Sequence, residues 1–245
     1  MKPDLHARSF WFVTAAAVVV ATVTLLLGQW QLRRAAQKEA SQAAVMAQSK
    51  LPTLDNASFY SLKNNLSAVY RPAQLRGVWQ VEHTVFLDNR PMVGKTGFFV
   101  VTPLALEGSS QVVLVQRGWV PRDYTSRTRL PDISTPQGTV TVRGHIAPPP
   151  SKLYEFKGVE SGRIRQNIDI TLFAAEISTP LLLVSLVQTG AADEGLLREW
   201  AAPNLGVERH YGYAFQWFAL CALVIGLYVW FQLIHPLRLK SRATS

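Results

Sequence analysis

The sequence predicts a membrane protein in which two transmembrane α-helices flank a mainly β domain, a small barrel or sandwich of α+β character. Two apolar segments lead to this prediction, residues 10–27 and residues 214–234, and neither contains a charged side chain. At about 1.5 Å per residue, helices of this length match a hydrocarbon core of roughly 30 Å. From Arg71 onward the pattern has period two and is rich in β-branched and aromatic residues, which favours strands.

Length and charge limit the class of protein. Of the 245 residues, the part between the two apolar segments has the size of one ordinary domain. A net charge of +9 is common in proteins that bind nucleic acid. The sequence has no zinc-ligand spacing, RNA-binding motif or block of like charge, so we expect no nucleic acid partner. A basic protein held on an anionic lipid bilayer is the favoured interpretation. Cys221 is the only cysteine, so no intramolecular disulfide can form.

The first apolar segment is interpreted as a retained anchor rather than a cleaved signal. Its apolar run exceeds the usual signal core, no small-x-small cleavage site follows closely, and Arg33 and Arg34 act as a stop. The leader is too short and too poor in Arg and Ser for a mitochondrial transit peptide, which favours a bacterial inner membrane. Lys and Arg are nearly balanced around the spans, and we expect both termini in the cytoplasm and the domain in the periplasm.

Five segments follow from this topology. They are a cytoplasmic N-terminus (1–9), a first transmembrane helix (10–30), an extracytoplasmic helix extension with the mainly β domain (31–212), a second transmembrane helix (213–234) and a cytoplasmic C-terminus (235–245). Residues 31–49 consist almost entirely of good helix formers, so the first helix is expected to continue beyond the membrane.

Within the domain, period and turn residues locate the elements. Strands are expected at residues 73–80, 84–89, 97–102, 111–115, 139–146, 163–168 and 181–189, and short helices at 59–64 and 170–177. Residues 88–91 and 107–110 are expected to form hairpin-like connections, and residues 121–138 a longer polar loop with Arg122, Arg127 and Arg129. Residues 191–207 are expected to be a polar return to the membrane that is mobile unless something docks on it.

The sequence offers no recognisable catalytic set. It has no nucleophile elbow, no paired histidine ligands and no glycine-rich phosphate loop. His83 and His145 are isolated on expected strands, where a single histidine is usually an ordinary sheet residue. We therefore expect a protein that is not an enzyme.

The most informative group of residues comes from the topology. The domain leaves and re-enters the membrane on one side, so residues 29–34 and 209–213 lie at the same depth. Helical spacing gathers Trp30, Arg33 and Arg34 on one helix, and His210, Tyr213, Ala214 and Trp217 on the other. This set suits a haem: His210 would ligate the iron, Arg33 and Arg34 would pair with propionates, and Tyr213 and Trp217 would pack against it. The alternative is that these residues are ordinary interfacial anchors.

Motifs distributed along the chain resemble one known family. They lie at residues 27–34 with Lys38, 70–72 with 76–77, 97–104, 115–122, and at His210 with 213–214 and 216–218. Asn167 and Asp169 are similar to a weaker motif. In this order, from about residue 27 to 231, they resemble the surfeit locus protein 1 family of cytochrome oxidase assembly factors.

The resemblance implies help in delivering or inserting haem a into oxidase subunit I, with His210 in contact with the haem. It implies subunit I, the haem a synthesis machinery and the lipid bilayer as partners. A membrane-anchored scaffold that binds oxidase subunits without touching cofactor remains the alternative, and an enzyme acting on haem or lipid is a third. In the domain, Gly77, Gly97 and Gly118 are expected to permit close backbone approach. For Arg117 and Arg122 an ion-paired core edge is favoured over a ligand site.

Overall fold

The computed structural model describes residues 5–123, 130–153, 162–200 and 206–235 of the chain. The chain divides into two compact units, one formed by Met1–Ala43 and Pro203–Ser245, and the other by Ala44–Ala202. The first unit is helical and the second is mainly β, so the predicted fold class is confirmed. Arg127 and Arg129 of the predicted polar loop lie outside the described residues.

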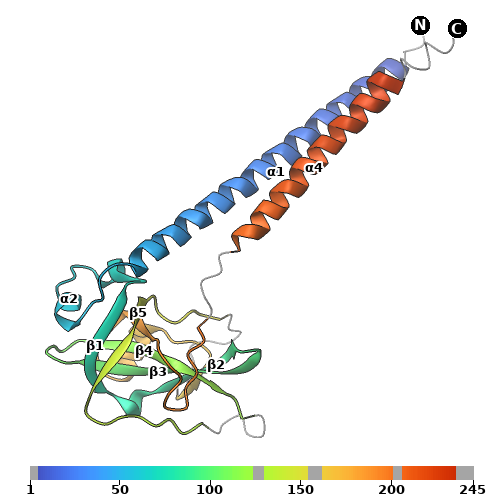
Figure 1. The fold of residues 1–245 in the computed structure, drawn as a ribbon. Helices are drawn as coiled ribbons and strands as arrows, with labels where there is room; N and C mark the ends of the chain where they lie inside the picture. Colours follow the sequence, from blue (N-terminus) through green and yellow to red (C-terminus); the bar gives the residue numbers. More distant parts are fainter. Residues whose placement is uncertain (1–4, 124–129, 154–161, 201–205, 236–245) are drawn as a thin grey trace. The chain divides into compact units, whose positions relative to one another are not determined.

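The helical unit contains α1 (Leu5–Ser49) and α4 (Val207–Tyr228), the latter extended by the π-helical η3 (Val229–Ile234). Figure 1 shows α1 and α4 running side by side in opposite directions. Both helices are long and apolar enough to cross a membrane, with mean hydropathies of 2.3 and 2.1 in their most apolar windows. Only 6% of each window is buried, so most apolar side chains face outward, as in a helix surrounded by lipid. As the composition of residues 31–49 predicts, α1 continues without a break to Ser49.

The two helices meet along a line of residues that we call the helix seam. Its members recur at alternating intervals of three and four, the spacing that keeps one helix face against a partner. On α1 they are Thr14, Ala17, Ala21, Thr24, Gly28, Gln31 and Ala35, and on α4 they are Val207, His210, Ala214, Trp217, Cys221, Val224 and Tyr228. All are buried or half-buried. Most of the α1 members are small, which lets helix backbones approach closely in a membrane.

Three contacts fix the antiparallel register of the seam. A Cβ added at Gly28 would lie 2.6 Å from the Phe218 ring, so the glycine makes room for that ring. The Cys221 thiol donates to the Ala21 carbonyl oxygen at 3.4 Å. Toward the end of the pair that contains Leu5, the hydroxyl oxygens of Thr14 and Tyr228 are 2.9 Å apart. The pair is therefore held along its length by small residues and short polar contacts.

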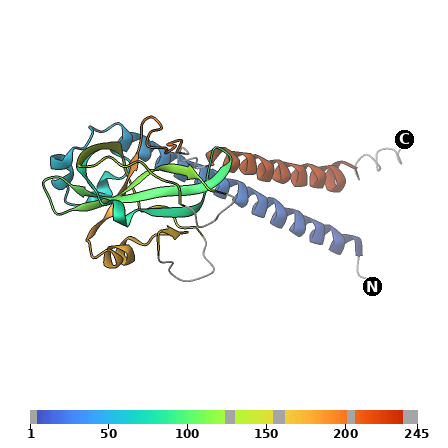
Figure 2. The ribbon, with the colours of Figure 1, turned by 90° about the horizontal axis from the view of Figure 1, so that it is seen from below.

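The domain is a barrel-like sheet (Figures 1 and 2). Its strands are β1 (Pro72–Trp79), β2 (Val85–Met92), β3 (Lys95–Leu106), β4 (Val112–Pro121), β5 (Thr139–Ala147), β6 (Ile164–Arg165) and β7 (Leu181–Gln188). They are hydrogen-bonded in the order β1-β5-β7-β4-β3-β2-β6, and an additional β1–β3 pairing closes the sheet on itself. The short helices are α2 (Asn56–Tyr60), η1 (Asn65–Ala68), η2 (Val81–His83) and α3 (Ile170–Glu176).

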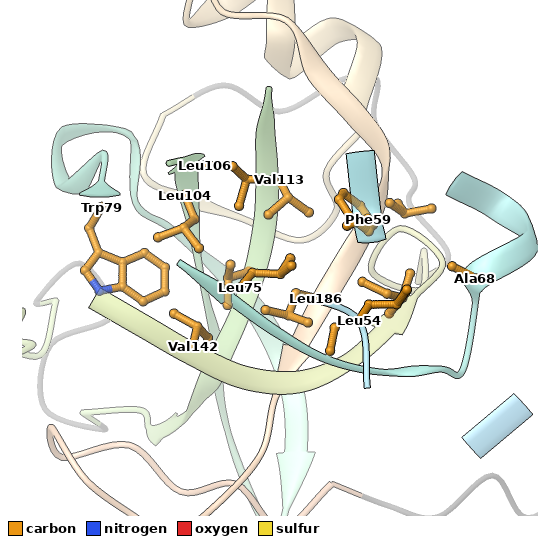
Figure 3. Close-up of a cluster of buried hydrophobic side chains, with 14 residues drawn as sticks. Leu54, Phe59, Ala68, Leu75, Trp79, Leu104, Leu106, Val113, Val142 and Leu186 are labelled. Atoms are coloured by element: carbon orange, nitrogen blue, oxygen red, sulfur yellow. The ribbon is translucent and has the colours of Figure 1, made fainter. Parts of the chain in front are cut away.

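The largest hydrophobic cluster fills the inside of the barrel. Figure 3 shows Leu75, Leu104, Val142 and Leu186 pointing inward from β1, β3, β5 and β7. Phe59 of α2 adds a ring that is only 1% exposed. The alternation of buried and exposed residues along β1 is the period-two pattern on which the strand prediction depends.

Several element boundaries differ from the prediction. Residues 88–91 do not form a hairpin connection, because they belong to β2, whose register shifts at a bulge between Leu87 and Arg90. The turn lies instead at Val93 and Gly94, which have φ of 49° and 70°. Bulges and turns favour similar residues, so the two are easily confused in a sequence. β4 runs six residues beyond the expected 115, to Pro121, and β6 contains only two residues.

The first part of the predicted polar return is not mobile, because it docks on the domain. Residues 190–200 pack on the domain: Leu196 is 1% exposed, and Leu197 forms an isolated bridge with Trp119. The Arg198 side chain, 2% exposed, donates from Nε to the Arg117 carbonyl oxygen at 2.8 Å. The polar composition of residues 190–200 favours mobility. Buried arginines of the domain nevertheless provide partners for these polar residues.

Candidate functional site

The candidate site lies at the first turn of α4. The helix begins after Gly206, which has a φ of 62° as its N-cap residue, and His210 is the fourth helical residue. His210 occupies a seam position and is half-buried, and Ala214, one turn further on, is 1% exposed. The imidazole therefore rests above a small side chain at the line where α1 and α4 meet.

Gln31 of α1 holds the imidazole on one side. The Gln31 side chain is buried at 9% exposure, and its Oε1 lies 2.7 Å from His210 Nδ1. An amide oxygen only accepts, so a hydrogen bond at this contact requires a proton on Nδ1. No described residue hydrogen-bonds to Nε2, and this atom is not enclosed by protein. The second ring nitrogen is therefore open to a ligand.

A further polar contact joins the helices near this site. Tyr211 donates from its hydroxyl to Glu39 Oε1 at 2.8 Å. Both side chains are exposed, so this contact borders the seam rather than filling it. Together with the His210–Gln31 contact, it makes this end of the helix pair polar, in contrast to the apolar stretch that follows.

The other site residues predicted from the sequence have different positions. Trp217 is half-buried in the seam, and Tyr213 is 51% exposed beside it. On α1, Arg34 lies three residues from Gln31, about 60° around the helix from it, at the edge of the seam. Its guanidinium carbon is 5.8 Å from the centre of the Trp30 ring. Arg33 is exposed and about 200° from Gln31, on the far side of α1.

The structure therefore brings residues 31 and 210 together and places Arg33 away from them. Gln31 received no role in the sequence analysis, although it lies inside one of the motifs. The signal that could have identified it is the spacing of Gly28, Gln31 and Ala35 on α1, which matches that of His210, Ala214 and Trp217 on α4. These spacings place Gln31 and His210 on the helix faces that meet, and the structure supplies the register that sets them opposite each other.

The side chains present are compatible with a haem. A single imidazole with an open nitrogen is a typical axial ligand, and a macrocycle supplies the remaining iron ligands itself. The small Ala214 leaves room beside the ring, exposed Tyr213 offers an aromatic surface, and Arg34 offers a cation at the edge of the seam. Among the described residues, no three His, Cys, Asp or Glu side chains gather as a metal-binding group. One histidine therefore suits a macrocycle better than a bare metal ion.

The arginines of the domain are engaged in structural contacts. Arg117 is completely buried, donates to Glu194 Oε2 at 2.6 Å, and lies 4.8 Å from the centre of the Trp79 ring. Arg122 pairs with Asp88. The favoured interpretation of Arg117 and Arg122 as ion-paired residues is confirmed.

The glycines of the same motifs also have structural roles. A Cβ at Gly97 would lie 2.1 Å from the Val120 carbonyl oxygen, and one at Gly118 would lie 2.7 Å from Leu196 Cβ. Both positions therefore require the close approach that the sequence predicts.

Comparisons with known proteins agree with this organisation. The family model described as "SURF1 family" matches residues 18–222. The chain is 28% identical over 229 residues to a SURF1-like protein of Rickettsia felis, covering 86% of this chain and 94% of that protein. It is 24% identical over 216 residues to a SURF1-like protein of Rickettsia bellii, covering 84% and 85%.

A plant protein is similar over a shorter region. Surfeit locus protein 1 of Arabidopsis thaliana is 27% identical over 117 residues, which cover 44% of this chain and 33% of that protein. The family match, by contrast, includes most of α1, the whole described domain and α4 as far as residue 222. The chain therefore belongs to the SURF1 family, a family of cytochrome oxidase assembly factors.

Proposed function

We propose that this protein holds haem a at His210 and assists its delivery to subunit I of a haem-copper terminal oxidase. The observation that carries the proposal is the open Nε2 of a histidine whose Nδ1 already has a partner. Histidines that ligate metals usually have this arrangement, because the bond at the other nitrogen fixes the ring orientation. Membership of a family of oxidase assembly factors supplies the client.

The side chains near His210 have separate roles in this proposal. His210 would hold the haem iron through Nε2, and the bound group would supply redox chemistry to the oxidase that receives it. Tyr213 and Trp217 offer packing surface next to the imidazole. Of the two arginines expected to pair with propionates, Arg34 is at the edge of the seam and is the one whose placement supports the role.

The proposed location is a bacterial inner membrane, with both termini cytoplasmic and the domain periplasmic. Two apolar helices and two bacterial relatives support it. The proposed partners are oxidase subunit I and the machinery that makes haem a. No catalytic role is proposed.

The experiment is a haem spectrum. The protein is expressed in membranes that make haem a, purified in detergent, and its reduced-minus-oxidised spectrum is compared with that of His210→Ala. We expect a haem a band in the wild type that is lost in the variant. His235→Ala is the control, because His235 is an exposed histidine just beyond the opposite end of α4 and η3. A wild-type protein without a band, or a band that survives in His210→Ala, would contradict the proposal.

One observation favours a second function, a scaffold that binds oxidase subunits without touching cofactor. The domain exposes large apolar side chains, including Val93 at 61% and Leu183 at 60%. Such side chains can serve as contacts for a protein partner. For a scaffold, His210→Ala leaves oxidase assembly intact, whereas Leu183→Asp or Val93→Asp prevents recovery of oxidase subunits with the purified protein.

A further inference from the structure

We propose that Gln31 is a positioning residue that selects the tautomer of His210 and sets how strongly its Nε2 donates electrons. The inference deepens the proposed function, since it concerns the side chain assigned there as the iron ligand. Gln31 lies on the other helix of the pair, 179 positions before His210 in the chain.

The orientation of the Gln31 amide carries the argument. Its oxygen, rather than its nitrogen, faces Nδ1 at 2.7 Å. A carbonyl oxygen requires a proton on the facing atom, so the neutral imidazole has Nδ1–H and an unprotonated Nε2. With the amide nitrogen facing the ring, the proton would be on Nε2 and would block a metal. The observed orientation therefore prepares Nε2 as a ligand and directs it away from Gln31.

Packing explains why the contact is specific. Ala35 is fully buried and Ala214 is 1% exposed, so the seam residue that follows each member of the Gln31–His210 pair is small. Small neighbours keep the two backbones close enough for a glutamine to reach across. Gln31 itself is 9% exposed. At such a site a hydrogen bond is strengthened by the low dielectric, and an unmade one is costly, so the pair persists.

No other described residue competes for this role. Glu39 contacts Tyr211 and not the imidazole. Among the residues whose contacts the structure describes, Gln31 is the one hydrogen-bond partner of the His210 ring. The strength with which Nε2 donates electrons to a metal therefore depends on this single acceptor, because a stronger acceptor at Nδ1 raises electron density at Nε2.

The first test needs no haem. The imidazole ¹⁵N shifts of ¹⁵N-histidine-labelled, haem-free protein report which ring nitrogen carries the proton, and His210→Ala assigns the signals of residue 210. We expect the Nδ1–H tautomer in the wild type and in Gln29→Leu, and loss of that preference in Gln31→Leu. Gln29 is the matched control, because it is a glutamine two residues away that is exposed on the outer side of α1.

The second test uses protein loaded with haem a. Gln31→Leu removes the acceptor, so we expect the reduction potential to rise and haem affinity to fall by about 10- to 100-fold. Gln31→Glu provides a stronger acceptor, so we expect it to keep the haem and to lower the potential below that of the wild type. This opposite pair of shifts separates positioning from a simple packing role, since both variants change the packing of the seam.

The outcomes distinguish the inference from the function on which it rests. An Nε2–H tautomer in the wild type, or unchanged ¹⁵N shifts in Gln31→Leu, overturns the inference whether or not haem binds. A wild type with the Nδ1–H tautomer but no haem a band overturns the proposed function and leaves the positioning of His210 standing. If Gln31→Leu does not fold, Gln31→Glu decides, because an unchanged potential in that variant contradicts the inference.

Discussion

The helix seam and the barrel domain place polar groups in protein interiors in opposite ways. In the domain, buried cations have protein partners: Arg117 pairs with Glu194, and Arg165, 4% exposed, pairs with Glu176. In the seam, His210 has a partner at Nδ1 and none among the described residues at Nε2. Paired charges stabilise a fold, whereas a ring nitrogen without a protein partner at a packed interface is available to a ligand. If the proposed function is correct, the domain supplies stability and the seam supplies binding.

Removing the partner of a buried cation should have a large effect on the stability of the domain. In Glu194→Gln the fully buried Arg117 loses its carboxylate, and we expect the domain to lose about 3–5 kcal/mol of unfolding free energy. Urea unfolding of the detergent-solubilised chain, followed by tryptophan fluorescence, measures the change. Glu107→Gln is the matched control, because Glu107 and its partner Arg76 are 49% and 60% exposed. This variant should change stability by less than about 1 kcal/mol. Equal effects of the two variants would show that burial of the pair is unimportant.

A bulky residue in the seam should affect binding and not the domain. In Gly28→Leu the new side chain meets the Phe218 ring, because even a Cβ would lie 2.6 Å from it. Overpacking of this kind costs about 1–3 kcal/mol, so we expect haem a occupancy to fall by about tenfold while the unfolding transition of the domain stays unchanged. Gly226→Leu is the control, since a Cβ there meets nothing within 4 Å. Normal occupancy in Gly28→Leu would contradict the importance of close helix approach.

The β2–β3 turn provides a smaller effect of opposite sign. Val93 has a φ of 49°, a conformation that is unfavourable for a β-branched residue and favourable for asparagine. Val93→Asn should therefore stabilise the domain by about 0.5–1 kcal/mol. The measurement is the urea midpoint. A decrease in stability would show that the 61% exposed valine makes a stabilising contact.

The smallest expected effect is on acid stability. The hydrogen bond from Arg165 lowers the pKa of Glu176 below its ordinary value of 4.5. A carboxylate with a depressed pKa adds stability that is complete above the unfolded pKa and is lost as pH falls through the folded pKa. Glu176 is 41% exposed, so Glu176→Gln should cost less than about 1 kcal/mol at neutral pH. The difference from the wild type should shrink as pH falls below 4.5 and disappear below the folded pKa of Glu176, and a difference that persists at still lower pH would contradict this origin.

Much of the fold and part of the site could be predicted from the sequence. Hydropathy identifies α1 and α4, and period two identifies most strands, because both signals are local and depend on which residues share a face. Topology predicts that the segments around residues 31 and 210 lie at the same depth. Local signals cannot separate a bulge from a turn, and they misplace the β2–β3 connection at residues 88–91.

The two apolar helices and most of the strands therefore follow from local sequence alone, and the depth of His210 in a membrane stays a prediction. Packing sets which faces meet: the structure pairs His210 with Gln31 and leaves Arg33 on the far side of α1. It also packs residues 190–200 on the domain, where Glu194 reaches Arg117. These contacts join residues 77 and 179 positions apart, so they depend on helix register and strand closure and not on local preference.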